Sequence, residues 1–135
     1  MDAQIPLYLL HPMAVHFPIA LLAVGWLAAV GSARKAAAPW LRPAAFWMLM
    51  LGVLGLWAAL GLGLLAAHLA PHEPSAWRVM ALHQRLAYYS AFAFSLVALA
   101  WRWAHGRRFW ALLLAWGLAY GLLAVTAHQG GRLVF

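Results

Sequence analysis

The chain has 135 residues, of which 67% are hydrophobic and only 8% are charged. A soluble domain carries roughly 25% charged and 45–50% apolar residues, so this composition excludes a water-soluble globule. Asp2 and Glu73 are the only carboxylic residues beside nine Lys and Arg, and cysteine is absent. Sites built from paired carboxylates, thiolates, iron–sulfur clusters or a covalently attached haem are therefore excluded. Histidine, arginine and aromatic residues remain to carry any chemistry.

Four long apolar segments dominate the chain. A membrane-spanning helix needs about 20 mainly apolar residues, and each segment approaches or exceeds that length. The loops between them are short, which favours antiparallel neighbours. We therefore predict an all-α integral membrane protein, a four-transmembrane-helix up-down-up-down bundle that forms one domain over residues 1–135. The expected helices are residues 7–31, 43–68, 76–103 and 108–128.

The loop charges predict the orientation in the membrane. In the second loop Arg78 is offset by Glu73, and Asp2 is the only charge before the first segment. Because cytoplasmic loops carry the excess of Lys and Arg, we expect the first and third loops in the cytoplasm and both termini in the periplasm of a bacterial inner membrane. We expect the first segment to be a retained helix and not a cleaved signal peptide. A signal peptide carries cations before its apolar run, whereas here the first cation follows it. The cations of the first and third loops are Arg34, Lys35, Arg42, Arg102, Arg107 and Arg108.

Six of the seven histidines map to the periplasmic half of this topology. Ionisable residues inside membrane segments are costly and favour a functional interpretation. His68 and His72 flank Pro71, which ends a helix, so we interpret both as interfacial residues. His105 lies alone on the inner side in a basic loop. The remaining outer histidines are His11, His16, His83 and His128.

His16, His83 and His128 are expected at a similar depth in the membrane, each on a different helix. His16 precedes Pro18, and a proline kink there is expected to direct its imidazole inward. His83 lies early in the third helix, which is diagonal to the first, about 14 Å away if neighbours pack at about 10 Å. His16 and His83 are the first predicted ligand pair, with His128 as the nearest alternative and His11 closer to the headgroups. Interhelical hydrogen bonds would explain each imidazole equally well.

The two ends of the chain carry recognisable motifs. Residues 11–21 (HPMAVHFPIAL) and 128–135 (HQGGRLVF) resemble a family of small bacterial four-helix membrane proteins of unknown function. The resemblance covers the whole chain, and a histidine near the start of helix three is matched by His83. Members also occur fused or adjacent to cytochrome-type modules, which implies membrane redox work. Many relatives carry acidic residues where this chain has Ala67-His68 and Arg132, so no role of those acids transfers.

The leading functional interpretation is a cytochrome b-like protein that binds haem b and carries electrons near the periplasmic face. Two imidazoles on facing helices can hold the haem iron without cysteine or acidic residues. Arg85 and Arg132 suit the haem propionates, although anionic headgroups would also attract them. A quinone or a cytochrome is the expected redox partner.

Two alternatives remain open from the sequence. His16, His83 and His128 could bind copper, zinc or iron directly, and Met1 and Met13 would favour Cu(I). The chain could equally be a non-catalytic structural subunit whose histidines only form hydrogen bonds. In every case the lipid bilayer is the expected environment and no nucleic-acid partner is expected. Either a homo-oligomer or a hetero-oligomer is compatible with the sequence.

Overall fold

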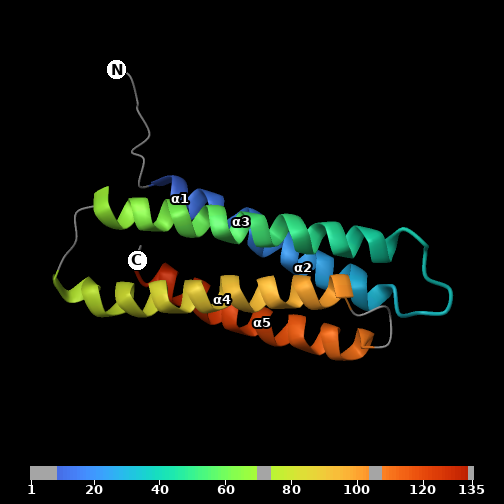
Figure 1. Cartoon of the computed structure of the whole chain (residues 1–135). Coiled ribbons are helices and arrows are strands. Elements are labelled where there is room, and N and C mark those ends of the chain that lie inside the picture. Colours follow the sequence, from blue (N-terminus) through green and yellow to red (C-terminus); the bar gives the residue numbers. More distant parts are fainter. Residues whose placement is uncertain (1–8, 70–73, 104–107, 134–135) are drawn as a thin grey trace, which may run out of the picture.

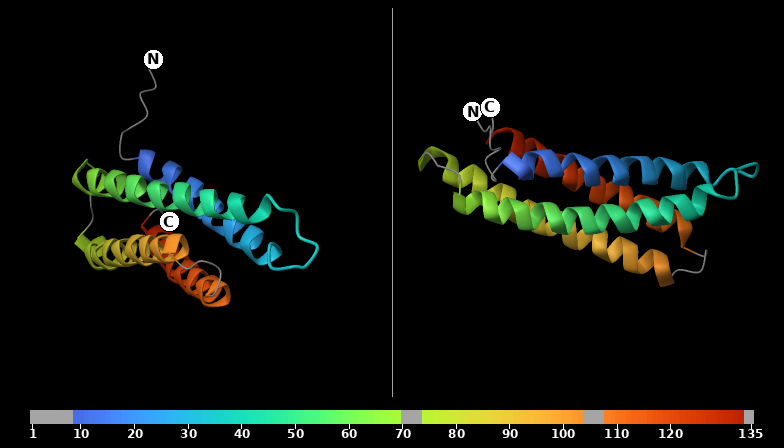
Figure 2. Two further views of the ribbon diagram at one scale, coloured as in Figure 1. Left: turned by 45° about the vertical axis from the view of Figure 1, so that its right-hand side comes forward. Right: turned by 90° about the horizontal axis from the view of Figure 1, so that it is seen from above.

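The computed structural model describes residues 9–69, 74–103 and 108–133, and it contains no strand in these ranges. The helical segments run side by side in alternating directions, and the first helix begins at the same end of the bundle at which the last helix ends (Figures 1 and 2). The predicted all-α, up-down-up-down arrangement is therefore confirmed. Its elements are α1 (Leu10–Ala14), α2 (His16–Gly31), α3 (Leu41–Leu69), the 3-10 turn η2 (Pro74–Ala76), α4 (Trp77–Trp103) and α5 (Phe109–Gly131).

The first rod of the bundle is broken between α1 and α2. Pro18 has no N–H to donate to the carbonyl of Ala14, so the regular ladder fails one turn before it. The amide of Val15 still donates to the carbonyl of His11 over 3.1 Å. Pro18 is fully buried, and a methyl group added at Gly55 would lie 3.0 Å from its Cβ. The helix is thus interrupted one turn before Pro18, as expected for a proline, and the proline ring packs against α3 at Gly55, where that helix has no side chain.

The helices form a closed ring of neighbours. α2 packs against α3 and α5, and α4 packs against the same two helices, so α2 and α4 are diagonal. Buried side chains from all four helices fill the centre of the ring. The largest of these side chains belong to Leu22, Leu49, Phe94 and Trp116, and none of the four has exposed surface.

Two glycines allow the helices around this core to approach closely. A methyl group added at Gly52 would lie 2.6 Å from Cδ2 of Leu22. One added at Gly25 would lie 2.9 Å from Cβ of Met48. Small residues at such contacts are typical of membrane helices, which associate through close packing because lipid is as apolar as their side chains.

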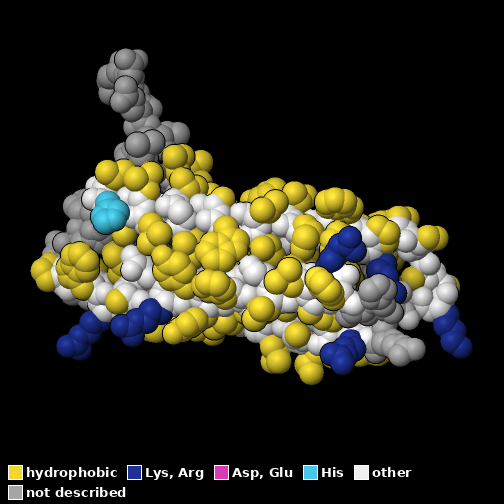
Figure 3. Space-filling view, in the orientation of Figure 1, with side chains coloured by type: hydrophobic (Ala, Val, Ile, Leu, Met, Phe, Trp, Pro, Cys, Tyr) yellow, Lys and Arg dark blue, Asp and Glu magenta, His cyan; other side chains and the backbone are white. Residues whose placement is uncertain are grey.

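The outer surface matches a lipid environment along the middle of the bundle. Hydrophobic side chains cover the middle of the face in Figure 3, and Lys and Arg lie towards its two ends. Three helical segments are long and apolar enough to cross a membrane, namely Leu10–Gly31, Leu41–Leu69 and Phe109–Gly131. α4 carries three arginines and is not in this group. The expectation of four transmembrane helices is therefore met for three of them.

We expect Gly52→Ala to destabilise the fold, while Gly61→Ala, on the same helix, does not. Leu22 is fully buried and cannot move away from a new methyl group, and overpacking of this kind typically costs about 1–3 kcal/mol. Nothing lies within 4 Å of a methyl group at Gly61, so this variant gains helix propensity without a clash. Thermal unfolding in detergent, followed by circular dichroism, measures the difference. Equal melting temperatures for the two variants would contradict the close contact.

Candidate functional site

Two imidazoles meet at the end of the bundle where α1 begins and α5 ends. The ring centroids of His11 and His83 are 6.2 Å apart and the ring planes are inclined by 72°. His11 comes from α1 and His83 from the first turns of α4, on the diagonal pair of rods (Figure 1). Both residues are half-buried. The structure thus brings together side chains that are 72 positions apart in the chain.

Each imidazole is held by a main-chain carbonyl of the neighbouring helix. Nδ1 of His11 lies 2.8 Å from the oxygen of Ala59 in α3, and Nδ1 of His83 lies 2.9 Å from the oxygen of Thr126 in α5. A carbonyl oxygen only accepts hydrogen bonds, so Nδ1 is the donor in both rings. In the neutral imidazole Nε2 then carries a free lone pair. The site therefore presents two nitrogen ligands of the same kind.

A glycine follows each acceptor carbonyl by one helical turn. The carbonyl of a helical residue points towards the residue four positions later, whose side chain can cover it. Those residues are Gly63 after Ala59 and Gly130 after Thr126. A methyl group there would lie 3.0 Å from Cε1 of His11 and 2.9 Å from Cε1 of His83, respectively. Each glycine thus leaves the space that its imidazole occupies.

The helical register explains why these two histidines face the interior. Residues seven, eleven and fourteen positions after a helical residue lie on its own face. These positions are buried after both His11 and His83, so both imidazoles continue a buried face towards the end of the bundle. The buried positions are Pro18, Leu22 and Gly25 after the first histidine, and Ser90, Phe94 and Val97 after the second.

The predicted pairing of His16 with His83 is not the one that the structure shows. His16 is exposed, and the expectation that the kink turns it inward is wrong. It lies five positions after His11, too far around the helix to share the buried face. His128 is also exposed, two positions beyond the buried Thr126. His11, expected nearer the headgroups, takes the place predicted for His16.

Other predicted residues lie around the same end without joining the pair. Arg85 and Arg132 are exposed, and Nη1 of Arg132 donates to the side-chain oxygen of Gln129 over 3.2 Å. His68 is exposed at the end of α3. Met13 is exposed as well. The predicted positions Met1, His72 and His105 lie outside the described residues.

A buried hydroxyl pair supports the His83 side of the site. Ser90 Oγ and Thr126 Oγ1 are 3.0 Å apart, and Oγ1 of Thr126 donates to the carbonyl of Leu122 over 2.9 Å. Ser90 is therefore the donor to Thr126. This link fixes the residue whose carbonyl accepts the hydrogen bond from His83. A buried serine facing a threonine is typical of a contact between membrane helices.

The whole bundle matches one family model. The family described as "Predicted membrane protein (DUF2231)" matches residues 8–135. The chain belongs to this family. This agrees with the resemblance to small membrane proteins of unknown function. The comparisons with curated proteins and with solved structures give no match. The DUF2231 match includes both histidines of the pair and their two glycines.

The residues of the histidine pair determine what this site can bind. It offers two imidazole nitrogens, and the part of the chain that the structure describes holds no group of three or more His, Cys, Asp or Glu that could bind a metal ion. The pair can therefore supply two ligands to a centre that brings its own remaining ligands, or two ligands to a two-coordinate ion. The two histidines can also serve only to hold helices together, because one hydrogen bond joins α1 to α3 and the other joins α4 to α5.

Gly130→Ala is expected to break the hydrogen bond between His83 and Thr126, because its methyl group takes the space of the imidazole. The side-chain ¹⁵N chemical shifts of His83 measure the change: Nδ1 carries the proton in the wild type, and the Nε2–H form should grow in the variant. The loss should cost about 1 kcal/mol of stability.

The adjacent Gly131 provides the control for this experiment. Nothing lies within 4 Å of a methyl group there, so Gly131→Ala should keep the wild-type nitrogen shifts. An unchanged tautomer in Gly130→Ala, or an equal change in both variants, would refute the assigned role of Gly130.

Proposed function

We propose that this chain is a b-type haem protein that carries electrons near the periplasmic face of the bacterial inner membrane, with His11 and His83 as the axial ligands of the haem iron. The observation that carries the proposal is the pair of facing imidazoles, each with Nδ1 bound to a carbonyl. Haem b, when bound, supplies a one-electron couple between its ferric and ferrous states. The residues of the chain hold it and set its surroundings.

The number of ligands favours haem over a bare zinc or iron ion. A protein site for zinc normally takes three or four side-chain ligands. Haem needs only two axial ligands, because its ring supplies the other four. The described residues offer two imidazoles and no larger metal-ligating group. With both axial positions filled by protein, the iron keeps no open position for substrate, which supports electron transfer rather than catalysis.

The geometry of the two rings fits one shared metal centre. With both Nε2 atoms pointing at one metal, a metal–nitrogen bond of about 2.1 Å on each side would put the two ring centroids roughly 6.5 Å apart. The observed distance is 6.2 Å. Histidines that bind metal typically donate their other ring N–H to a carbonyl or carboxylate, which orients the ring. Both Nδ1 contacts are of that kind.

The surroundings at this end suit a haem with its propionates towards water. Arg85 and Arg132 are exposed there, and a guanidinium pairs well with a carboxylate. The half-buried site lies close to the end of the bundle, which favours exchange of electrons with a quinone in the membrane or with a cytochrome at its surface. The exposed Tyr88 and Tyr89 on α4 could border a quinone there.

Both chain termini and the histidine pair are proposed to face the periplasm, with α4 as the fourth membrane span. α4 is 27 residues long, about 40 Å, and lies between two helices that are apolar enough to span. Its outer face carries Phe92, Leu96 and Leu99, all exposed, as expected for contact with lipid. The cations of the first and third loops belong to the opposite end of the bundle. Cytoplasmic loops typically carry such an excess of Lys and Arg.

Reporter fusions test the orientation. Alkaline phosphatase, which is active only in the periplasm, should be active when fused after Phe135 and inactive when inserted at Gly106. A cytoplasmic reporter at the same two points should give the reverse pattern. Neutralising Arg34, Lys35 and Arg42 together should weaken the preference, because it removes cations that resist translocation. Phosphatase activity at Gly106 would overturn the assignment of the histidines to the periplasm.

Absorption spectra test the haem. The full chain, produced with adequate haem and purified gently, should show a Soret band and the reduced α-band of low-spin haem b. His11→Ala and His83→Ala should each lose the haem or turn it high-spin, because one axial ligand is missing. His16→Ala and His128→Ala, at exposed positions, serve as matched controls and should keep the low-spin spectrum.

The same samples distinguish the alternatives. Copper near one equivalent per chain without a Soret band would assign the site to Cu(I), which accepts two nitrogen ligands. A stable protein that binds neither haem nor metal would leave only the structural role, in which the histidines tie helices together. Low-spin haem that survives His11→Ala but not His16→Ala would refute the ligand pair. Each variant must first be shown to insert and remain monodisperse.

A further inference from the structure

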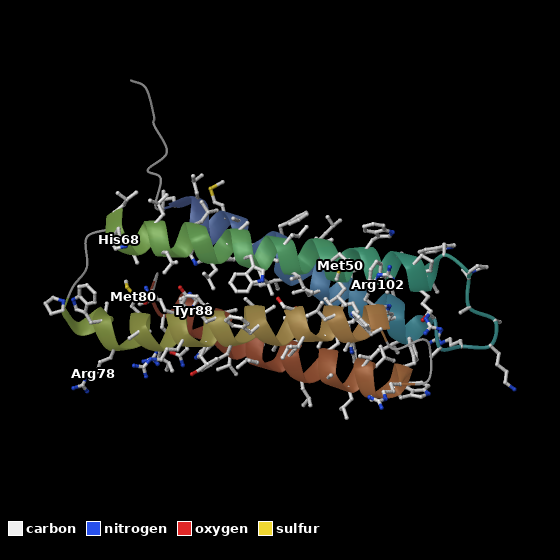
Figure 4. All side chains as sticks on the ribbon, viewed as in Figure 1. Met50, His68, Arg78, Met80, Tyr88 and Arg102 are labelled. Carbon is white, nitrogen blue, oxygen red and sulfur yellow. The ribbon has the colours of Figure 1, made fainter. Side chains whose placement is uncertain are left out.

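A second site lies at the opposite end of the bundle, in an open groove between α3 and α4. Its volume is about 910 Å³, within the range of small-ligand sites. The walls are almost entirely apolar and include Met50 and Val53 on α3 and Leu99 on α4. Arg102 is the one charged side chain that lines it. In Figure 4, Met50 and Arg102 lie close together on the two facing helices.

The position of this groove matches the boundary between lipid and water. Four tryptophans at this end have more than half of their surface exposed, and such rings are enriched at the level of the headgroups. Arg102 is on the last turn of α4, so the groove runs from the headgroup level towards the middle of the bilayer. The four residues are Trp40, Trp47, Trp103 and Trp110.

The cations at this end of the bundle have no carboxylate partner in the neighbouring sequence. Asp2 and Glu73 are the only acidic residues in the sequence, and neither belongs to the helices or the loop that form this end. Arg42 lies over the ring of Phe109, with its Cζ 4.8 Å from the ring centroid. Arg102, exposed at the mouth of an apolar groove, therefore combines a cation for a phosphate with an apolar surface for a hydrocarbon chain.

We propose that this groove binds an anionic phospholipid, with the phosphate at Arg102 and one acyl chain between α3 and α4. The site is independent of the histidine pair, which lies at the other end of the bundle. Its Ser95 is already engaged, accepting from Nε1 of Trp57 and donating to the carbonyl of Ala91, so the groove offers no free hydroxyl for a polar ring. Basic sites between membrane helices bind anionic lipids by the same combination of contacts.

Another groove on the surface provides an internal comparison. It lies between α4 and α5, has a volume of about 410 Å³, and its lining has no charged residue. Leu118 lines it and is 68% exposed, much as Leu99 lines the first groove and is 58% exposed. Headgroup selectivity is therefore expected for the α3/α4 groove alone.

Native mass spectrometry of the full chain tests the proposal, using mixed micelles with equal amounts of phosphatidylglycerol and phosphatidylcholine. The wild type should retain phosphatidylglycerol preferentially. Arg102→Gln should lower that preference about fivefold, as expected for one cation at the membrane surface. Leu99→Trp should fill the groove and lower retention of both lipids. Arg34→Gln and Leu118→Trp are the controls, and both should behave as the wild type.

Several outcomes would overturn the proposal. An equal loss of preference in Arg102→Gln and Arg34→Gln would mean that the general positive charge attracts the lipid. Unchanged retention in Leu99→Trp would mean that no acyl chain lies in the groove. Displacement by millimolar inorganic phosphate, or by an equimolar isoprenoid quinone, would assign the site to those ligands instead. Circular dichroism of each variant must first match the wild type, and Arg102→Gln, which alters an exposed side chain, keeps the test valid if Leu99→Trp does not fold.

Discussion

The bundle depends on close contacts at positions where a helix has no side chain. Gly25 and Gly52 admit the core between α2 and α3, Gly55 admits the proline after the helix break, and Gly63 and Gly130 admit the two imidazoles. Membrane helices gain little from excluding lipid, so packing and hydrogen bonds must hold them together. Polar contacts between such helices contribute about 0.6 kcal/mol on average to stability. A glycine that permits such a contact therefore determines how the side chain is placed as much as how stable the bundle is.

The two helical hairpins, one from α1 to α3 and the other from α4 to α5, are held together by the same kind of contact. In each, a histidine near the start of the first rod donates to a carbonyl of the second, and a glycine stands four residues after that carbonyl. The hairpins differ below the histidines, where Pro18 packs on Gly55 in one and Ser90 bonds to Thr126 in the other. The imidazoles thus make equivalent hydrogen bonds but have different surroundings. A centre bound between them would meet an apolar helix break on one side and a hydroxyl pair on the other.

The sequence predicts the fold of this protein better than its site. Apolar length and short loops suffice for the helices and their alternating order, because every residue of a long apolar segment contributes to that signal. The site depends on single positions. His11 and His16 have similar apolar neighbours, and only the register of Pro18 and Leu22 shows which one faces inward. The acceptor carbonyls of Ala59 and Thr126 leave no trace in the local sequence around the histidines, since each belongs to another helix.

The shortage of carboxylates links the two ends of the molecule. With nine Lys and Arg against two Asp and Glu, most cations have no acidic partner within the chain. Arg42 uses the face of Phe109 instead, and Arg132 uses the amide oxygen of Gln129. These neutral partners leave the positive charge uncompensated, so it attracts anions from the surroundings. In a membrane the abundant anions are lipid phosphates. The excess of positive charge therefore makes both ends of the bundle suitable for anionic groups, whether headgroups or propionates.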